Sequence, residues 1–307
     1  MKPLHIETPL FESPALSEIA GRSIWLKLEA LQPPGSFKIR GIGAACQEYA
    51  RRGAERFISS SGGNAGIAVA YAGRRLSRPV VVVVPETTTE RAKALIRQEG
   101  ADVIVHGASW FEANALAKSM VTEKDAFLHP FDDPLVWEGH STLIDEVVRS
   151  GLGPDAVVVA VGGGGLLSGV LAGMHRHGWT DIPVLAVETG GADSLAQSVR
   201  AGKPVELPAI TSIATSLAAK RVCDQAFEWT TRHPVKNVVV TDRSAVSACM
   251  RFIDDQRIVV EPACGAALAA LYERVPEVKE HRSILVVVCG GVTATLEQLE
   301  KWTDEID

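Results

Sequence analysis

The feature of this chain that most restricts its fold is a series of short apolar runs separated by amphipathic segments. The clearest run spans residues 79–84, where one proline precedes five consecutive valines. A continuous run of β-branched residues is typical of a strand that is buried on both faces. Because such strands alternate with helical segments along the chain, we expect parallel, twisted sheets flanked by helices.

The alternation is interrupted once, by the proline-bounded loop 130–134, and resumes after it. We therefore expect an α/β protein of two lobes, in which residues 1–30 and 134–307 form a large domain and residues 31–133 a smaller inserted one. Strands are expected at residues 23–28, 56–60, 79–84, 101–105, 156–161, 184–188, 238–240 and 284–288. Helices are expected at residues 41–51, 67–76, 89–99, 109–124, 138–150, 166–177, 262–272 and 294–302, and from residue 242. Residues 189–234 give no clear pattern.

Composition excludes several classes of partner. The chain has 307 residues, a net charge of −6 and only isolated pairs of adjacent basic residues, which argues against nucleic acid or an anionic membrane as partner. No apolar run approaches the roughly 18 residues of a membrane span, and residues 1–8 contain no apolar signal core. Five cysteines without CxxC spacing indicate reduced thiols in the cytosol rather than disulfides or a zinc site.

The stretch 31–41 contains a lysine in an unusual setting. Two prolines and Gly35 break regular structure there. Ser36 is expected to cap the helix that follows, so that Lys38 lies in its first turn. The positive end of the helix dipole disfavours a charged amine and lowers its pKa. A partly neutral lysine can attack a carbonyl carbon and form a Schiff base, whereas the alternative is an ordinary solvated lysine.

Four consecutive glycines, residues 162–165, join an expected strand to an expected helix. Their N–H groups can converge on an anion, and the helix N-terminus favours its charge. No lysine follows them as in a Walker A loop, and Leu167 or Ser168 stands where a dinucleotide pattern needs its third glycine. Glu188 does lie where a ribose-binding acid would be. A compact phosphate monoester suits this loop best, with a dinucleotide and a purely structural turn as alternatives.

Glycine-rich turns follow three of the expected strands, after Ser60, Val161 and Val288. In open α/β sheets, ligands bind beyond the carboxyl ends of the strands. A Schiff-base lysine together with a phosphate-binding loop is what pyridoxal 5′-phosphate requires. These observations favour a site for that cofactor at the strand ends.

With these features the chain resembles the fold type II, or β-family, pyridoxal-phosphate enzymes over nearly its whole length, and specifically the serine/threonine dehydratases. The motifs that carry the resemblance, in family order, are Ser36–Gly41, Ser60–Gly66, Phe131–Pro134 with Trp137–His140, Gly162–Gly165, Glu261–Ala267 and Cys289–Gly291. The resemblance implies that the large domain binds the cofactor and that the cofactor lies in the cleft between the lobes.

The resemblance also implies a role for each matching residue. Lys38 would hold the cofactor as a Schiff base and then accept the substrate Cα proton. Phe37 would lie on the pyridine face, with core packing as its alternative role, and Asn64 would donate to the phenolic oxygen. The phosphate would be bound by Gly162, Gly163, Gly164, Gly165 and Leu166. The substrate carboxylate would be held by Ser61, which could instead cap a helix, and by the N–H groups of Gly62, Gly63, Asn64 and Ala65.

Cys289 stands where the family places the partner of the pyridine nitrogen. An aspartate there would keep the nitrogen protonated and favour a long-lived carbanion, whereas a thiol is a weak donor. A weaker electron sink suits prompt loss of a β-substituent over racemisation or transamination. The alternative role of Cys289 is that of a small buried hydrophobe.

The dehydratase branch further implies a monovalent cation, such as K⁺, held by oxygen ligands. The matching positions are Gly162, Glu188, Ala192, Leu217 and Ala219. An exposed, unliganded Glu188 is the alternative. Of the nearby polar residues, His140 is expected on a helix surface or behind the site, and Asp133 as a helix cap.

The activity that the resemblance implies is deamination of a small amino acid, L-serine and also L-threonine, to a 2-oxo acid and ammonia, in a cytoplasmic homodimer without feedback regulation. The alternatives are a β-replacement enzyme such as cysteine synthase, a nicotinamide-dependent oxidoreductase, and a weakly active protein that only binds the cofactor. Gly62 stands where comparable dehydratases carry serine or alanine. We expect space beside the substrate there, and weaker or shifted activity in consequence.

Overall fold

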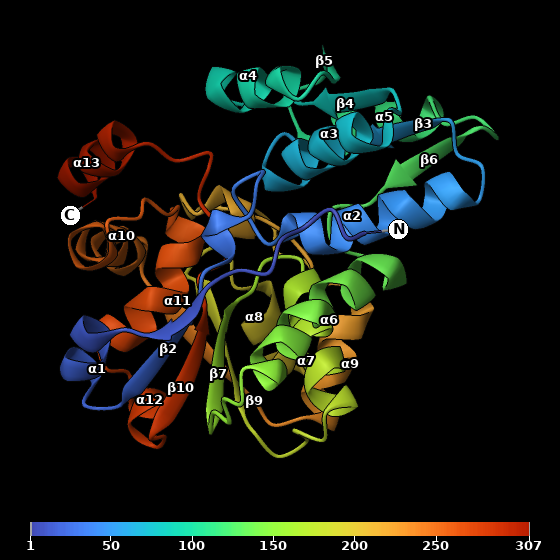
Figure 1. Ribbon diagram of the computed structural model, residues 1–307. Coiled ribbons are helices and arrows are strands. Elements are labelled where there is room, and N and C mark those ends of the chain that lie inside the picture. The colour runs from blue at the N-terminus through green and yellow to red at the C-terminus, as the bar shows by residue number, and fades with distance from the viewer. Residues whose placement is uncertain (1, 307) are drawn as a thin grey trace. The chain divides into compact units, whose positions relative to one another are not determined.

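The computed structural model describes residues 2–306 and separates them into two units, each with its own sheet (Figure 1). Unit 1 comprises Met1–Ile6 and Gln32–His140, and unit 2 comprises Glu7–Leu31 and Ser141–Asp307. The α/β class and the mostly parallel sheets are confirmed. Within the described residues, no helix is long and apolar enough to cross a membrane.

Unit 1 contains a four-stranded parallel sheet in the order β5-β4-β3-β6. Its strands are β3 (Arg56–Ser59), β4 (Val80–Val84), β5 (Asp102–Val105) and β6 (Asp125–Leu128). Its helices are α2 (Lys38–Arg51), α3 (Asn64–Leu76), α4 (Glu90–Gln98) and α5 (Trp110–Ser119), and α6 (Pro134–Arg149) begins in this unit. Because the strands are parallel, the segments that follow all four of them emerge at one edge of the sheet.

The valine run of β4 is buried on both faces of this sheet, as its sequence predicts. Val81 and Val83 belong to a core cluster with Ala113 and Ala117 of α5. The alternate valines face the other way, because a Cβ atom added to Gly73 of α3 would lie 2.1 Å from Cγ2 of Val80. Helices α3 and α5 therefore cover opposite faces of the sheet.

Unit 2 contains a six-stranded sheet in the order β1-β2-β10-β7-β8-β9, in which only β1 runs antiparallel to its neighbour. The strands are β1 (Leu10–Glu12), β2 (Ser23–Lys27), β7 (Ala156–Ala160), β8 (Val184–Thr189), β9 (Val235–Val240) and β10 (Ser283–Val287). Short 3₁₀ turns occur at η1 (Glu29–Leu31) and η2 (Thr215–Leu217).

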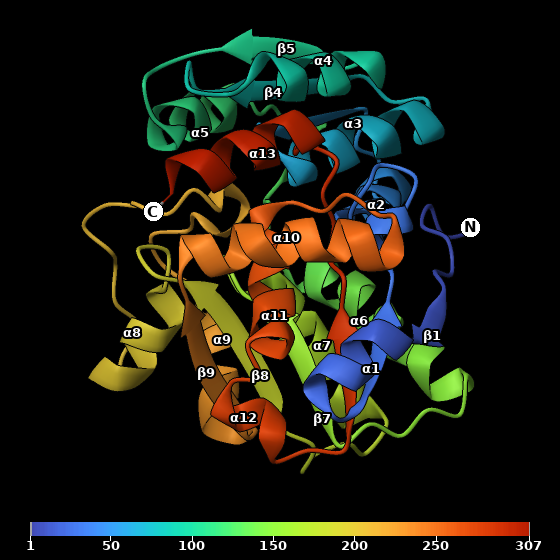
Figure 2. The same cartoon turned by 90° about the vertical axis from the view of Figure 1, so that its left-hand side faces the viewer.

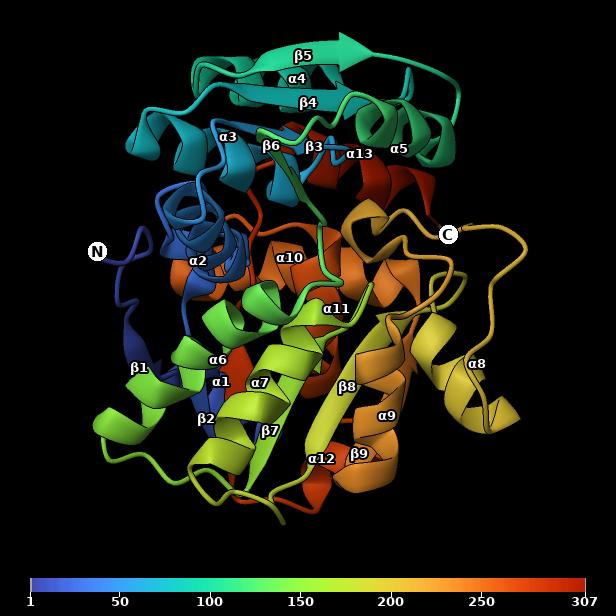
Figure 3. The same ribbon diagram turned by 90° about the vertical axis from the view of Figure 1, so that its right-hand side faces the viewer.

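Helices cover both faces of this second sheet. Figure 2 shows α1 (Pro14–Ala20), α10 (Asp242–Gln256), α11 (Pro262–Tyr272) and α12 (Pro276–Lys279) in front of one face. Figure 3 shows α7 (Gly165–Arg176) and α9 (Asp224–Arg232) in front of the other. Helix α11 is buried on every side, which agrees with its alanine-rich, apolar sequence. The remaining helices of the unit are α8 (Ser194–Ala201) and α13 (Leu296–Glu305).

The observed elements differ from the expected ones at several places. No element was expected at β1, α1 or β6, and residues 189–234, which gave no pattern, contain α8, η2 and α9. Helix α3 begins at Asn64, three residues before the expected start. Helix α6 begins at Pro134 because Asp133 caps it, its Oδ1 accepting from the N–H of Leu135 at 2.8 Å, which confirms the capping role of Asp133.

Candidate functional site

Lys38 lies at the carboxyl edge of the unit 1 sheet. It is the first residue of α2, and its Nζ donates to the carbonyl oxygen of Pro130, two residues after β6, at 2.7 Å. The same nitrogen lies 5.1 Å from the centroid of the Phe37 ring. The amine therefore occupies the region beyond the strand ends, where ligands bind in sheets of this kind.

The cap expected for α2 is absent. Phe37 is the N-cap residue and makes no side-chain capping bond, while Ser36 is buried and its Oγ has no hydrogen-bond partner within residues 2–306. The prediction that Ser36 caps the helix was therefore wrong. A serine before a helix is compatible with a cap, but here the helix begins two residues later and Ser36 does not fill that position.

His140 supports this helix start instead. Its Nδ1 accepts from the N–H of Gly41, in the first turn of α2, at 3.1 Å, and its ring lies 4.8 Å from that of Phe37. Of the two positions expected for His140, the helix surface was wrong, because the side chain is fully buried, whereas a position behind the site agrees with its contact with Phe37. Burial, followed by the nearby charges of Lys38 and Arg40, holds the pKa of His140 well below its ordinary value. The ring is therefore neutral and able to accept.

The asparagine loop follows β3 at the same edge of the unit 1 sheet. Asn64 is the first residue of α3, and the N-cap residue Gly63 provides no side chain to its N–H groups. Ser61 does not cap this helix, since its Oγ accepts from the N–H of Gly63 at 3.4 Å. Gly66 is required for the close approach of the first turn, because a Cβ atom there would lie 1.8 Å from the Ser61 carbonyl oxygen. Because Gly63 makes no side-chain capping bond, the positive end of the α3 dipole is a setting that attracts a carboxylate.

Thr88 belongs to this edge as well and was not predicted from the sequence. It lies in the turn after β4, and a Cβ atom on Gly62 would be 2.6 Å from its Oγ1 and 2.7 Å from its Cγ2. The expected space beside Gly62 is therefore filled by Thr88. A threonine between two other threonines carries no sequence signal for this contact, because the loops of β3 and β4 meet only in the folded sheet.

In unit 2, the tetraglycine loop follows β7 and leads directly into α7. Gly164 is the N-cap residue of α7 and has a φ of +90°, a conformation that favours glycine. A Cβ atom on Gly164 would lie 2.3 Å from Cβ of Ala226, and one on Gly162 would lie 2.9 Å from Cα of Leu217. The glycines thus permit close packing against η2 and α9.

Cys289 follows β10 and is buried beside a second thiol. A hydrogen bond with Cys264 and then burial raise the pKa of Cys289 well above its ordinary value. The thiol is therefore neutral, which makes it a weak hydrogen-bond donor.

Glu188 lies on β8 and is fully buried, so the alternative of an exposed glutamate was wrong. Its two carboxylate oxygens accept from the N–H groups of Leu195 and Ala196, in the first turn of α8, both at 2.8 Å. Burial raises the pKa of Glu188 to about 8, against the opposing effect of these two hydrogen bonds. Gly162 emerges from the neighbouring strand, because Val161 pairs with Val187 through a backbone hydrogen bond of 2.8 Å.

A family model described as pyridoxal-phosphate dependent enzyme matches residues 1–290. This chain belongs to that family. A Mus musculus protein named serine dehydratase-like is 49% identical over 98% of this chain and 94% of its own length. A Bos taurus L-serine dehydratase/L-threonine deaminase is 47% identical over 97% of this chain and 94% of its own. A fungal L-serine ammonia-lyase from Rhizomucor miehei has a similar structure, with a TM-score of 0.95, 35% identity and 100% coverage of both chains.

The residues of this pyridoxal-phosphate enzyme fit its cofactor. The 12-residue helix α7 begins without a side-chain cap, so its first N–H groups can bind a phosphate. A Cβ atom on Gly163 would meet nothing within 4 Å, so the loop has open space on that side. Lys38 supplies an amine at the edge of unit 1, as a carbonyl cofactor requires. The family match excludes the alternative of a nicotinamide-dependent oxidoreductase.

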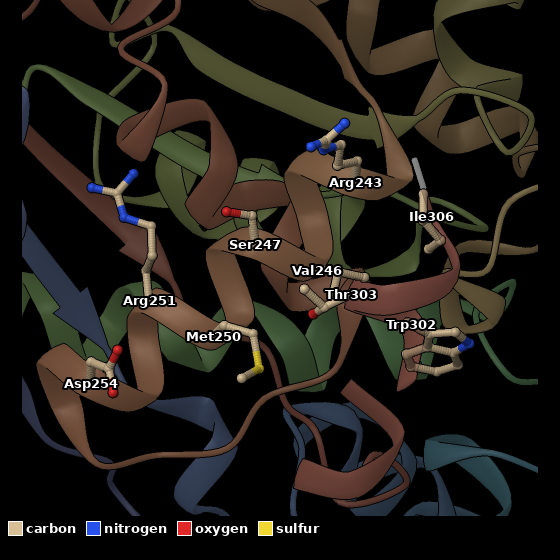
Figure 4. A pocket seen from close by; sticks show the side chains of 9 residues that line it. All are labelled: Arg243, Val246, Ser247, Met250, Arg251, Asp254, Trp302, Thr303 and Ile306. Atoms are coloured by element: carbon tan, nitrogen blue, oxygen red, sulfur yellow. The ribbon is translucent and has the colours of Figure 1, made fainter. Parts of the chain in front are cut away.

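The predicted residues do not line the cavity between α10 and α13. This cavity measures about 280 Å³ and is lined by Arg243, Val246, Ser247, Met250, Arg251, Asp254, Trp302, Thr303 and Ile306 (Figure 4). Among residues 2–306, no three His, Cys, Asp or Glu side chains are grouped so as to hold a metal ion. A cation at the predicted positions would therefore depend on backbone oxygens in addition to the Glu188 carboxylate.

Proposed function

We propose that this chain deaminates L-serine and L-threonine by α,β-elimination, giving a 2-oxo acid and ammonia. The observation that carries the proposal is the Lys38 amine, which lies 2.7 Å from the Pro130 carbonyl at the carboxyl edge of unit 1. Its support is the similarity to proteins named L-serine dehydratase/L-threonine deaminase in cattle and L-serine ammonia-lyase in a fungus. Pyridoxal phosphate, when bound, draws electrons from the substrate Cα, so that a proton and the β-hydroxyl can leave.

We propose that residues of unit 1 hold the cofactor ring and the substrate. Lys38 would hold the cofactor covalently through Nζ and later accept the Cα proton at the same atom. Asn64 would donate to the cofactor's phenolic oxygen, and Phe37 would contact its ring. The substrate carboxylate would bind Ser61 and the N–H groups at the start of α3, where the helix dipole favours an anion.

In unit 2, we propose that the N–H groups of residues 162–166 hold the cofactor phosphate, because α7 offers them no internal acceptor. Cys289 would face the pyridine nitrogen. As a neutral thiol it would leave that nitrogen weakly bonded, which favours rapid loss of the β-hydroxyl over reprotonation at Cα. On this proposal unit 2 is the phosphate-binding domain.

We also propose a monovalent cation beside Glu188, bound by this carboxylate and by the backbone oxygens of Gly162, Ala192, Leu217 and Ala219. The buried carboxylate supports the proposal, since a cation would offset its desolvation. The test compares turnover in potassium chloride and in tetramethylammonium chloride at equal ionic strength. Equal turnover in both salts would refute the cation site.

The experiment that tests the function is a coupled assay of 2-oxo acid release from L-serine, L-threonine and O-acetylserine. We expect release from serine and threonine. Formation of cysteine from O-acetylserine and sulfide, without 2-oxo acid release from serine or threonine, would instead indicate β-replacement. The homodimer and the cytoplasmic location stay predictions, to be checked by light scattering and by fractionation of the source cells.

A further inference from the structure

Gly62 and Thr88 form a close contact between two loops of unit 1. A Cβ atom on Gly62 would lie 2.6 Å from Oγ1, 2.7 Å from Cγ2 and 3.2 Å from Cβ of Thr88. A rotation of Thr88 about χ1 would not clear this space, because a β-branched side chain places a γ atom in two of its three staggered positions. Gly62 and the bulk of Thr88 are therefore matched to one another.

The backbone fixes Thr88 in this position. Its N–H donates to the carbonyl oxygen of Pro85 at 3.0 Å, and the next residue, Thr89, caps α4 by accepting from the N–H of Ala92 at 3.3 Å. A turn on one side and a capped helix on the other leave the threonine little freedom to withdraw. The Thr88 side chain therefore packs against Gly62 in a fixed position. Gly63, the next residue after Gly62, faces open space instead, with nothing within 4 Å of an added Cβ atom.

We propose that Thr88 determines substrate specificity, because its side chain fills the volume beside Gly62 and so limits the size of the group on the substrate β-carbon. The inference depends on the proposed function, in which the 61–65 loop holds the substrate carboxylate. The β-carbon is one bond from Cα, so a substrate anchored at this loop brings its β-substituent near the residues that border it. Thr88 acts through its shape rather than through its hydroxyl.

The first experiment measures kcat/KM for L-threonine and L-serine in the holoenzyme and in Thr88→Ala. Because one methyl group in a hydrophobic pocket changes discrimination by about tenfold or more, we expect the threonine-to-serine ratio to rise about tenfold. Thr88→Val keeps the shape and should leave the ratio near that of the wild type. The matched control is Thr87→Ala, an exposed neighbour, which should change nothing.

The second experiment tests the contact itself and does not depend on activity. Gly62→Ala should lower the urea midpoint of the cofactor-free protein, because the new methyl group overlaps Thr88. The double variant Gly62→Ala/Thr88→Ala should recover most of that loss, a coupling that independent sites would not show. Additive losses in the two single variants would overturn the packing argument.

Two outcomes separate this inference from the proposed function. If the wild-type protein releases a 2-oxo acid from serine or threonine but Thr88→Ala keeps the wild-type ratio, the specificity role of Thr88 is wrong and the proposed function stands. If the wild-type protein acts on neither amino acid, the proposed function itself fails. A ratio that shifts in Thr88→Ala and not in Thr88→Val supports the inference.

Discussion

The backbone N–H of Gly41 donates to Nδ1 of His140 over 3.1 Å and so ties the first turn of α2 to α6. The two helices cross closely here, since a Cβ atom on Gly41 would lie 2.4 Å from the Val136 carbonyl oxygen and one on Gly139 would lie 2.4 Å from that of Arg40. Lys38 is three residues from this bond. A helix start without its own cap is thus held in place by a histidine about a hundred residues away in sequence.

This bond predicts a difference between two variants of His140. His140→Leu leaves the buried Gly41 N–H without its acceptor, which should destabilise the protein by about 1–3 kcal/mol. His140→Asn keeps an acceptor near the position of Nδ1 and should lose less. Urea unfolding of the cofactor-free protein measures both, and equal losses would show that the ring contributes packing rather than the hydrogen bond.

The tetraglycine loop predicts that two neighbouring substitutions separate stability from cofactor binding. Gly164→Ala places a methyl group 2.3 Å from Ala226 at a φ of +90°, so it should cost about 1–3 kcal/mol of stability. Gly163→Ala meets nothing within 4 Å and should leave the cofactor-free protein as stable as the wild type. It should still weaken pyridoxal-phosphate binding about tenfold or more, or by about 1.4 kcal/mol, because the methyl group takes the phosphate's space. Unchanged affinity in Gly163→Ala would place the phosphate elsewhere.

The lowered pKa of His129 predicts that the protein becomes less stable as the pH falls. Its Nδ1 accepts from the N–H groups of Phe131 and Asp132, and burial, then the charges of Lys118 and Lys38, lower its pKa from 6.5 to about 4. Between these values the unfolded chain binds a proton that the folded chain excludes, so stability falls as the pH decreases from about 6.5 to about 4. His129→Asn removes the titration and should show a shallower loss in urea titrations at pH 7, 6 and 5. Parallel curves for both proteins would contradict this assignment.

Much of the fold follows from local sequence patterns. The five valines of β4 and the alanine-rich α11 have patterns that their burial explains directly. The strand β6 and the helix α8 were not predicted, because their own sequences give little local signal. Strand β6 has four residues with two polar or aromatic side chains half-buried, and α8 begins without a side-chain cap because Glu188 satisfies its N–H groups from β8. Because this cap is supplied by a residue on a strand, the sequence next to α8 does not indicate where the helix begins.

In the candidate site as well, some residues could be placed from local sequence and others could not. The positions of Lys38, Asn64 and the tetraglycine loop at the starts of α2, α3 and α7 could be predicted, because each of these segments connects a strand to a helix through residues with special backbone requirements. The supporting residues could not, since their contacts are made across the fold. His140 replaces the cap expected from Ser36, and Thr88 fills the space expected beside Gly62. Both depend on loops and helices that approach one another only after folding.

The proposed function requires a covalent bond between Lys38 and the cofactor, and one measurement tests this bond most directly. The holoenzyme is reduced with borohydride, digested and analysed by mass spectrometry, with Lys38→Ala treated in parallel. We predict that the reduced cofactor is found on the peptide containing Lys38, and that Lys38→Ala carries no cofactor label and loses turnover of L-serine. A label on a different lysine, or full turnover by Lys38→Ala, would contradict the account.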